Sequence, residues 1–501
     1  MVQLAHWLAQ LGLWTLVAMV LLGAVPLVAA VCQFLLIGLH RLRHHYRDTS
    51  AFEPRVAILV PAWNEAAVLE ASIDRLVGLE YSPDRLRVYV VDDASTDATP
   101  EVVQAKARQY PGMVVHLRRD KGGQGKAHTL NHGLRTILAD DWMQALLIMD
   151  ADVIYEPDSL RKMTRHLADE RVGAVTAYIK EGSRPGNYLQ RFVAYEYITA
   201  QAAARRAQNV LGALACLAGG AQLHSRANLE AIGGQIDTSS LAEDTFTTFN
   251  TQLAGNRVVF EGNATVWAEE PDGIVGLWKQ RLRWARGNVQ VTLRFRHLWF
   301  HPNRDHKLGS ISFGIFWFSL FLLPVFMIAS SAALLTLYFV DFPLSWLVFR
   351  QLWIINAISY LFITCFALAI DPATARRAWL EAVLFPGLVS VAIIAYTCAP
   401  VGFEAAVWWW GEHTGLVWGS VTTRVAMLIA YSWLSLCMPI AWLGKKAEEL
   451  GRGWLSPLFI YLGGYGPLLC AVTFTSYIRE LRGAEMTWDK TIKTGKVAIS
   501  A

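Results

Sequence analysis

An excess of charge of either sign is missing from this sequence of 501 residues. Lys and Arg together number 45 and Asp and Glu 41, so the formal net charge is +4. Proteins that bind nucleic acids through their phosphates carry a clustered basic excess. The balanced charge therefore favours no nucleic-acid partner.

Residues that build disulfide frameworks and metal clusters are also few. The chain has six Cys, none in a CxxC pair, and 13 His without a metal-ligand spacing. His128 and His132 are four residues apart, but no Glu follows His128 as it does in zinc-binding helices. Five of the Cys lie in apolar runs and are interpreted as small buried hydrophobic residues. A zinc or disulfide scaffold is not expected.

Charged residues make up only 17% of the chain, whereas hydrophobic residues make up 54% and Trp occurs 20 times. This composition is typical of an integral membrane protein. Residues 11–38 form an almost uncharged run longer than the roughly 20 residues that span a bilayer. Further spanning candidates are residues 311–340, 346–370, 380–399 and 421–443.

Basic residues at the ends of these runs predict the topology. The cluster within Arg41–Arg47 follows the first run and favours a cytoplasmic location for that end. We therefore expect an amino-terminal anchor at 1–45, a cytoplasmic domain with interfacial helices at 46–305, a multi-span channel domain at 306–480 and a cytoplasmic tail at 481–501.

Two segments of the expected channel domain are unusual. Residues 400–420 contain no Lys or Arg and are expected to form an external loop. Its Trp408–Trp410 run fits an interfacial aromatic belt, with sugar stacking as the alternative. Residues 456–478 contain two Pro and three Gly, which favour a re-entrant or interfacial hairpin over a full span.

Residues 46–305 have frequent charges, and short apolar strands alternate with helical patterns. Expected strands are residues 56–60, 87–91, 114–117, 145–149 and 173–177. Expected helices are residues 65–79, 98–109, 126–138, 157–168 and 188–208. The alternation predicts an α/β domain with a mainly parallel sheet.

Two acidic clusters follow expected strands. Ligands of open α/β sheets bind outside the carboxyl ends of the strands. Asp92 and Asp93 could accept hydrogen bonds from a nucleoside there, or cap the following helix. Asp150 and Asp152 are spaced i and i+2, so both carboxylates can reach one hard cation such as Mg²⁺ or Mn²⁺ and a neighbouring diphosphate.

A third acidic cluster and one lysine are further candidates. Either carboxylate of Glu243 and Asp244 could serve as a general base, with Asp244 preferred, or the pair could cap a helix. Lys126 follows the glycine-rich turn Gly122–Gly125 and could meet a phosphate. The turn lacks the Ser or Thr of an ATP-binding P-loop.

The stretch Gln280–Trp284 joins a fork-shaped cation to a broad aromatic face. Arg283 can donate two parallel hydrogen bonds to a diphosphate, and Trp284 can pack against the apolar face of a sugar ring. A basic helix lying at the membrane surface is the alternative interpretation.

Four motifs follow one another along the chain: Asp92–Asp93, Asp150 with Asp152, Glu243–Asp244 and Gln280–Trp284. In this order they resemble the motifs of the processive family 2 glycosyltransferases, which include cellulose, chitin, hyaluronan and poly-N-acetylglucosamine synthases. Pro61–Glu65 looks like the first-strand turn of that family, and Gly276–Ala285 looks most like the bacterial poly-N-acetylglucosamine synthases. Ala218–Gly220 stands at the acceptor-site turn but differs from the cellulose synthase version. The resemblance covers about residues 55–300 and implies a nucleotide-sugar glycosyltransferase A-type fold.

The resemblance implies a role for each matching residue. On the donor side, Asp93 with Asp92 would hold the uridine, Asp150 and Lys126 would contact the nucleotide, Asp152 with Asp150 would bind the metal, and Glu65 belongs to the substrate-binding turn. On the acceptor side, Asp244 would be the base, Gly219 would form the acceptor turn, and Gln280, Arg283 and Trp284 would hold the diphosphate and the acceptor sugar.

The implied activity is inverting, processive polymerisation of a UDP-hexose or UDP-N-acetylhexosamine, with UDP-N-acetylglucosamine as the best guess. The product would be a β-linked exopolysaccharide of the biofilm type, moved across the inner membrane. The expected partners are the UDP-sugar donor, the growing polysaccharide and the lipid bilayer, and a need for accessory export subunits stays open. Alternatives are a transferase that adds one sugar to a membrane lipid, a cellulose-like β-glucan synthase, and a scaffold protein without catalysis.

Overall fold

The fold is known from a computed structural model, which describes residues 2–42, 49–184, 186–414, 420–486, 495 and 497. The chain divides into two compact units. A helical unit comprises Met1–Phe34, Gly273–Leu282 and Ile315–Arg479, and a sheet unit comprises Leu35–Asp272, Arg283–Gly314 and Glu480–Ala501. The basic positions 43–47 and the tail 487–494 lie outside the described residues. The four-part domain division expected from the sequence stays a prediction.

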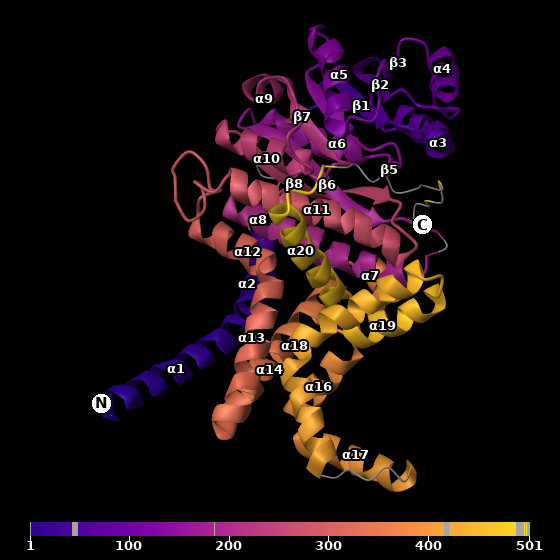
Figure 1. Cartoon of the computed structure of the whole chain (residues 1–501). Coiled ribbons are helices and arrows are strands. Elements are labelled where there is room, and N and C mark those ends of the chain that lie inside the picture. Colours follow the sequence, from indigo (N-terminus) through magenta and orange to yellow (C-terminus); the bar gives the residue numbers. More distant parts are fainter. Residues whose placement is uncertain are drawn as a thin grey trace. The chain divides into compact units, whose positions relative to one another are not determined.

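The sheet unit is built on an eight-stranded sheet in the order β3-β2-β1-β4-β7-β6-β8-β5 (Figure 1). Its strands are β1 Val56–Ala62, β2 Leu86–Asp92, β3 Val114–Arg118, β4 Ala145–Ile148, β5 Val153–Tyr155, β6 Val172–Glu181, β7 Gln222–Ser225 and β8 Arg257–Ala268. The first four strands pair in parallel, as do β6 and β8. Strand β7 runs antiparallel to both β4 and β6, and β5 runs antiparallel to β8. The expected α/β domain is confirmed, with a mixed sheet that is parallel in its first half.

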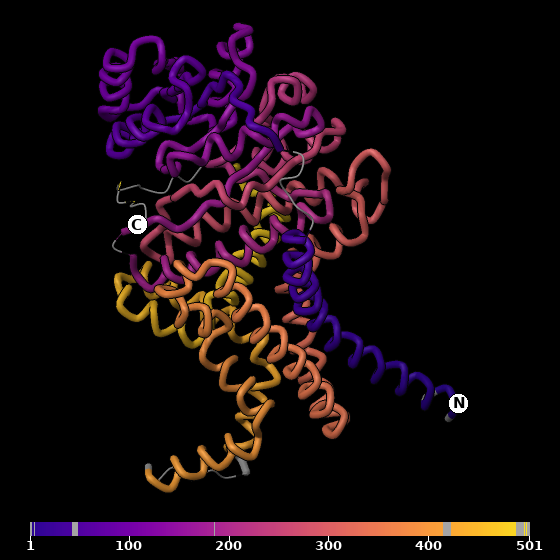
Figure 2. The backbone as a smooth tube through the Cα atoms, turned by 180° about the vertical axis from the view of Figure 1, so that it is seen from behind, coloured from indigo at the N-terminus to yellow at the C-terminus, as the bar shows by residue number. Residues whose placement is uncertain are grey.

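Helices flank this sheet. Those of the sheet unit are α3 Ala66–Val77, α4 Thr99–Gln109, α5 Lys126–Leu138, α6 Ser159–Thr164, α7 Tyr188–Tyr197, α8 Ala204–Leu211, α9 Arg226–Ala231, α10 Glu243–Leu253 and most of α11 Ile274–Arg294. Leu130, Leu134 and Ile137 are spaced along one face of α5 and pack against the strands that carry Leu59 and Leu146. Figure 2 shows the segment from β1 to β4, in purple, gathered as one part of the sheet unit.

The expected helix over 188–208 is interrupted. Asn187 caps α7 by accepting hydrogen bonds from the backbone of Leu189 and Gln190, and the Gln190 side chain completes a capping box. The segment Ile198–Ala203 then adopts a π-helical turn before α8 begins. Such turns insert an extra residue into the helical ladder and re-aim the side chains that follow.

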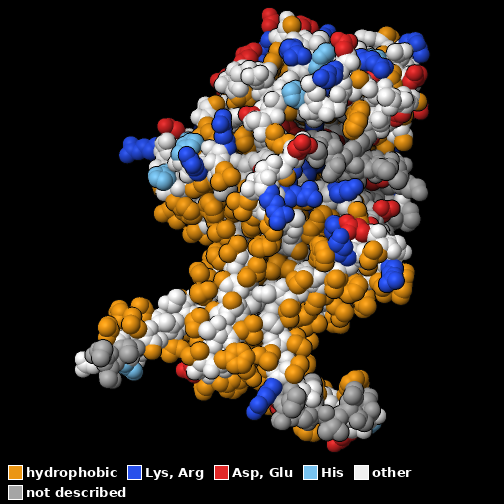
Figure 3. Space-filling model, in the orientation of Figure 1, with side chains coloured by type: hydrophobic (Ala, Val, Ile, Leu, Met, Phe, Trp, Pro, Cys, Tyr) orange, Lys and Arg blue, Asp and Glu red, His pale blue; other side chains and the backbone are white. Residues whose placement is uncertain are grey.

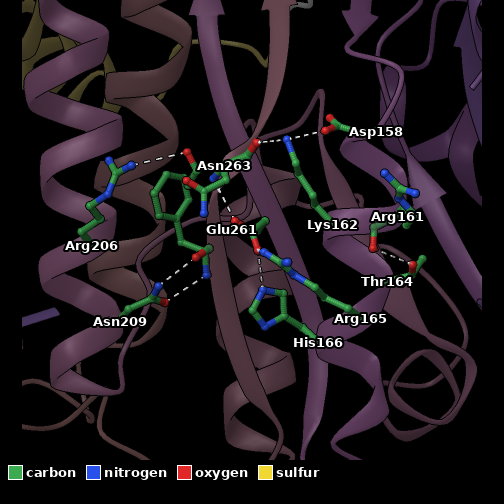
Figure 4. A network of polar contacts seen from close by, with 12 residues as sticks. Asp158, Arg161, Lys162, Thr164, Arg165, His166, Arg206, Asn209, Glu261 and Asn263 are labelled. Atoms are coloured by element: carbon green, nitrogen blue, oxygen red, sulfur yellow. Dashed lines mark hydrogen bonds and ion pairs between the residues drawn. The ribbon is translucent and has the colours of Figure 1, made fainter. Parts of the chain in front are cut away.

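Strand β8 is secured by buried polar contacts (Figure 4). Glu261 is fully buried and lies 2.7 Å from Arg165 Nη2 and 2.8 Å from His166 Nε2. Burial alone would raise the pKa of Glu261, but these two partners outweigh it and lower the pKa to about 2. Asn209 of α8 exchanges two hydrogen bonds, both of 2.9 Å, with the backbone of Phe260. Helices on the two sides of β8 are thereby tied to it.

The helical unit contains segments long and apolar enough to cross a membrane. Four such helices are found in the described residues, at His6–Leu42, Leu323–Val340, Phe342–Ile370 and Thr422–Glu449. Hydrophobic side chains cover their visible surface in Figure 3, whereas charged side chains gather over the sheet unit. Hydrogen bonds between polar side chains join helices inside the unit. The Tyr431 hydroxyl lies 3.2 Å from Ser345 Oγ, and Trp433 Nε1 donates to Ser390 Oγ at 2.9 Å.

Several expected spans differ in detail. The expected span 311–340 is divided into α12 Ile311–Phe321 and α13 Leu323–Val340, and Pro324 occupies the first turn of α13. The expected span 380–399 is a bent pair, Pro372–Val383 and Leu388–Cys398, at 77°. Where a loop was expected at 400–420, Pro400–Thr414 is helix α17. Pro324 explains the break between α12 and α13, since Pro fits the first turn of a helix but not its interior.

Residues 453–481 form a second bent pair, Gly453–Gly463 and Tyr465–Leu481, at 98°. This geometry is that of a broken span or a re-entrant loop, so the expected hairpin remains one of two possibilities. Gly464, at φ +103°, lies at this bend, and Gly387, at φ +90°, lies at the other. A Cβ on Gly387 would lie 2.7 Å from the Gly464 nitrogen. The two bends therefore cross backbone to backbone, which only glycine permits.

Candidate active site

Hydrogen bonds join the loops after β1 and β2 at the carboxyl end of the sheet. Asn64 adopts φ +54°, and its side-chain oxygen accepts from the Thr96 backbone at 2.8 Å. The Glu65 backbone donates to Thr99 Oγ1 at 2.8 Å. The half-buried Glu65 is thereby fixed beside the loop that follows β2, in the position where such sheets bind ligands.

Asp92 and Asp93 hold neighbouring backbone segments. Asp92 is fully buried, accepts from the Ser95 backbone at 2.8 Å and lies 3.3 Å from Arg118. Asp93 accepts from the Gly123 backbone at 2.9 Å and is paired with Arg119. Asp93 thus anchors the glycine-rich turn that leads into Lys126. The expectation that these two residues hold the uridine stays a prediction.

Lys126 is the centre of a second group of side chains. Its side chain is 8% exposed, and Nζ lies 2.5 Å from Asp150 Oδ1 and 3.7 Å from Glu243 Oε1. Nζ also donates to the Gly219 carbonyl at 3.1 Å. Burial lowers the pKa of Lys126, but the carboxylates of Asp150, Glu243 and Asp244 together outweigh burial and raise it. The ammonium therefore stays charged among three carboxylates.

Gly219 is surrounded by this group. A Cβ at Gly219 would lie 3.1 Å from Lys126 Nζ, 3.4 Å from Asp244 Oδ2 and 3.9 Å from Asp150 Oδ2. A hydrogen bond to strand β6 holds the turn that carries Gly219, because the Ala218 backbone donates to Thr176 Oγ1 at 3.1 Å. Residues from four separate segments of the chain therefore converge on one point at the end of β4.

The two acidic residues at the start of α10 have different surroundings. Glu243 is 5% exposed, whereas Asp244 is half-buried. Burial raises the pKa of Glu243 to about 6; Asp244 adds to this shift, and Lys126 and Arg283 oppose it. Asp244 Oδ1 accepts from the Thr245 backbone at 2.7 Å, which orients the carboxylate. Asp244 is the more accessible base of the two.

Helix α11 carries the residues that are expected to contact phosphate and sugar. Gln280 is 7% exposed, and Arg281 donates to its side-chain oxygen at 2.6 Å. Arg283 and Trp284 follow one turn later, and Trp284 is 37% exposed. Arg283 lowers the pKa of Glu243 electrostatically, so its charge acts on the Lys126 group.

Residues 54–287 match the family described as glycosyltransferase like family 2. Over 302 residues the chain is 30% identical to the probable glycosyltransferase YdaM of Bacillus subtilis, with 60% of this chain and 70% of that protein covered. The chain belongs to the family 2 glycosyltransferases. It is accordingly a nucleotide-sugar transferase, as expected.

Two further similarities extend this picture. This family 2 glycosyltransferase is 27% identical over 240 residues to poly-β-1,6-N-acetyl-D-glucosamine synthase of Staphylococcus aureus, and the match covers 48% of this chain and 56% of the synthase. Among solved structures, the mannosyltransferase PcManGT from Pyrobaculum calidifontis, in complex with GDP-Man and Mn²⁺, matches with a TM-score of 0.49 and 22% identity. That match covers 83% of this chain and 99% of the other.

The family 2 glycosyltransferase has a carboxylate pair that fits a divalent cation. In the part of the chain that the structure describes, no group of three or more His, Cys, Asp or Glu is arranged to hold a metal ion. Asp150 and Asp152 are half-buried carboxylates beyond β4. Mg²⁺ and Mn²⁺ are commonly held by one or two carboxylates together with substrate phosphates. The pair therefore fits a metal that arrives with a nucleotide diphosphate.

Two residues of the glycosyltransferase site were not foreseen from the sequence. Tyr155 donates from its hydroxyl to the Gly220 carbonyl at 2.9 Å, and burial together with Asp150 raises the pKa of Tyr155 well above its usual value. Cys216 lies beside Asp244, and burial raises the pKa of this thiol. Neither residue belongs to a motif with recognisable spacing, so only the folded chain reveals them.

Proposed function

We propose that this family 2 glycosyltransferase is a membrane-embedded, inverting polysaccharide synthase that uses a UDP-hexose or UDP-N-acetylhexosamine, with UDP-N-acetylglucosamine as the first choice. The observation that carries the proposal is the convergence of Lys126, Asp150, Gly219 and Asp244 at one strand end. A cation, a possible metal-binding carboxylate, an open turn and a base are the parts that a glycosyl transfer from a nucleotide diphosphate requires.

Asp244 is the base of the proposed reaction. Its carboxylate takes the proton of an acceptor hydroxyl, and the acceptor oxygen forms a bond to the anomeric carbon of the donor. The bond between that carbon and the diphosphate oxygen breaks, and UDP leaves with the bonding electrons. One displacement inverts the configuration, so an α-linked donor gives a β-linked product. A positioned base of this kind contributes roughly 10²–10⁴-fold to the rate.

Lys126 and Arg283 face the negative charge that develops on the departing diphosphate. Lys126 stays cationic, and Arg283 can donate two parallel hydrogen bonds to phosphate oxygens. Asp152 with Asp150 would hold Mg²⁺ or Mn²⁺, which supplies charge stabilisation to the phosphate oxygens when bound. Asp93 anchors the glycine-rich turn on the donor side, with Asp92 buried behind it and Glu65 in the adjacent turn.

Trp284 and Gln280 are proposed to receive the acceptor sugar. An exposed indole offers the apolar face against which a pyranose ring packs. The helices of membrane length support the proposal that the polymer grows toward the membrane and is exported through it. In this proposal the sheet unit lies on the cytoplasmic side of the inner membrane. The similarity to poly-β-1,6-N-acetyl-D-glucosamine synthase favours N-acetylglucosamine as the donor sugar. Accessory export subunits are no part of the proposal.

A donor panel tests the proposal. Full-length protein in lipid nanodiscs is incubated with UDP-N-acetylglucosamine, UDP-glucose, UDP-N-acetylgalactosamine and GDP-mannose, each with Mg²⁺ or Mn²⁺, and nucleotide release is measured. Product size and linkage are then determined by enzymatic digestion and mass spectrometry. We expect UDP release with an N-acetylhexosamine donor and a β-linked polymer.

Other outcomes identify the alternatives. A glycolipid with a single added sugar would contradict polymer synthesis and support a lipid-directed transferase. A polymer formed only from UDP-glucose would support a β-glucan synthase. Release of GDP alone would overturn the uridine assignment, and no release with any donor would overturn the catalytic proposal.

A further inference from the structure

Arg286 of α11 is enclosed by the segment Glu480–Glu485. Its side chain is 5% exposed, and Nε donates to Glu480 Oε1 at 2.5 Å. Nη1 donates to the Glu485 carbonyl at 2.9 Å and Nη2 to the Ala484 carbonyl at 2.6 Å. An Arg fork that reaches one carboxylate and two carbonyls is held in a single orientation. The segment and the helix are thus locked together.

Gln290, one turn further along α11, joins the same carboxylate to the loop before α10. Its Nε2 donates to Glu480 Oε2 at 3.3 Å. Its Oε1 accepts from the Leu241 backbone at 2.9 Å and lies 3.2 Å from Ser240 Oγ. The Ser240 oxygen in turn accepts from the Ala242 backbone at 3.0 Å. Both ends of the Gln290 amide are therefore used, one on the carboxylate and one on the loop.

The backbone of α11 touches this loop as well. A Cβ at Gly287 would lie 2.5 Å from the Cβ of Ala242, closer than real Cβ atoms approach. Ala242 precedes α10 and offers no side-chain cap, so Gln290 and Ser240 supply the polar support at this helix start. Arg283, Gly287 and Gln290 are spaced i, i+4 and i+7 and share one face of α11. The face that carries the Arg fork therefore also holds the start of α10.

We propose that Glu480, Arg286 and Gln290 are positioning residues that fix the start of α10, and with it Asp244, relative to Arg283. The inference rests on the proposed function, in which Asp244 is the base and Arg283 faces the diphosphate. The three residues act through the loop and the helix. A displacement of about 1 Å between reacting groups can cost roughly 100-fold in rate, so a small shift of α10 is enough to slow transfer.

Gln290→Leu tests the relay in the full-length protein. The variant keeps the size of the side chain and removes its hydrogen bonds to the loop and to Glu480. With the donor that the wild type turns over, we expect kcat to fall about 30- to 100-fold while the KM for donor changes less than about 3-fold. The matched control is Asn288→Leu, an exposed amide on the same helix, which should retain the wild-type kcat.

An exchange of the two hydrogen-bonding groups separates positioning from general support. Gln290→Glu alone places two carboxylates against each other, and we expect kcat to fall at least about 10-fold. Adding Glu480→Gln to that variant reverses donor and acceptor and should return kcat to within about 3-fold of wild type. Glu485→Gln is the control, because its side chain is exposed and its carbonyl still accepts from Arg286.

The outcomes discriminate between the two proposals. A wild-type kcat for Gln290→Leu would overturn the relay and leave the proposed function intact. A double variant no faster than Gln290→Glu would do the same, because a merely structural role predicts that the two losses add. A wild-type protein inactive with every donor would instead contradict the proposed function. Thermal unfolding of each variant identifies one that fails to fold, and the exchange pair, which removes no side chain, then decides.

Discussion

Lys106 and Lys126 are two lysines of the sheet unit that are similar in burial and in pairing with carboxylates but differ in role. Their side chains are 7% and 8% exposed, respectively. Each lies within 4 Å of two carboxylates, which are Glu70 and Asp74 for Lys106, and Asp150 and Glu243 for Lys126. Burial and pairing alone therefore do not distinguish a structural lysine from one in an active site.

The difference lies in where the partners come from. Glu70 and Asp74 are spaced i and i+4 on α3, so one helix supplies both, and Lys106 also donates to Gln109 at 3.1 Å. Asp74 is the strongest influence and raises the pKa of Lys106. Among the partners of Lys126, Asp150 follows strand β4, Glu243 begins helix α10, and the Gly219 carbonyl belongs to a turn. The Lys126 group is therefore assembled from several segments, whereas one helix supplies both carboxylates of Lys106.

Asp244→Asn should show the largest difference between the two regions. The amide cannot accept the proton of the acceptor hydroxyl, so we expect kcat to fall roughly 10²–10⁴-fold. Asp74→Asn, which alters the partner of Lys106, should leave kcat within about 2-fold of wild type. Nucleotide release at saturating donor measures both. A wild-type rate for Asp244→Asn would exclude this residue as the base.

Lys126→Met should have the next largest effect. It leaves three carboxylates facing the donor diphosphate, and we expect kcat/KM to fall about 100-fold. Lys106→Met is the matched control, because it should keep kcat/KM and lose only about 1 kcal/mol of stability, since its partners are largely exposed. Steady-state kinetics and thermal unfolding are measured together. Equal losses of activity in both variants would show that the two lysines are equivalent.

Gly219→Ala tests the close packing around Gly219 in the Lys126 group. The new Cβ would lie 3.1 Å from Nζ, so the ammonium must move by a few tenths of an ångström. We expect kcat to fall about 10-fold, which corresponds to roughly 1.4 kcal/mol. Gly38→Ala, whose Cβ would meet nothing within 4 Å, is the control. An unchanged rate for Gly219→Ala would mean that acceptor and donor approach from another side.

The acid limb of the pH profile should show the smallest effect. Burial raises the pKa of Glu243 to about 6. As pH falls through 6, Glu243 gains a proton and the Lys126 group loses a negative charge, so we expect kcat to fall several-fold. Glu243→Gln should flatten this limb, and Glu70→Gln should leave it unchanged. An acid limb retained in Glu243→Gln would assign the titration to another group.

The same pKa shift makes a prediction of opposite sign for stability. The folded-state pKa of Glu243 lies above its ordinary value of 4.5, so the folded protein binds the proton more tightly than the unfolded chain does. The contribution of Glu243 to stability therefore rises as pH falls from about 6 to 4.5. Comparison of thermal unfolding of wild type and Glu243→Gln across this range measures it.

The first half of the sheet unit was predictable because its signals are local. Strands β1 to β4 are short runs rich in apolar residues, and each expected boundary lies within two residues of the observed one. Helix α5 was expected at its observed bounds. Strand β7 escaped prediction because it carries the buried polar residues Gln222 and His224. Strand β8 escaped because a bulge around Gly262 interrupts its pairing with β6.

The long apolar helices show a similar division. Hydropathy located the four that the described residues contain, because this prediction needs only length and composition. The bends at Gly387 and Gly464 were not foreseen, since they depend on two glycines more than 70 residues apart meeting backbone to backbone. The helix at Pro400–Thr414 was also missed, because a segment rich in Trp and without Lys or Arg is equally compatible with a loop.

The sequence by itself determined the kinds of residue available to the site and the strand ends at which several of them lie. Asp92, Asp150 and Lys126 were identified there because strand ends and glycine-rich turns leave local marks. Tertiary structure alone decided which carboxylates share Lys126, that Glu243 is buried beside Asp244, and that Arg286 and Gln290 grip Glu480. The contacts of Lys126 with Glu243 and of Arg286 with Glu480 join residues more than 100 positions apart. Such contacts are set by packing of the whole chain, which local periodicity does not record.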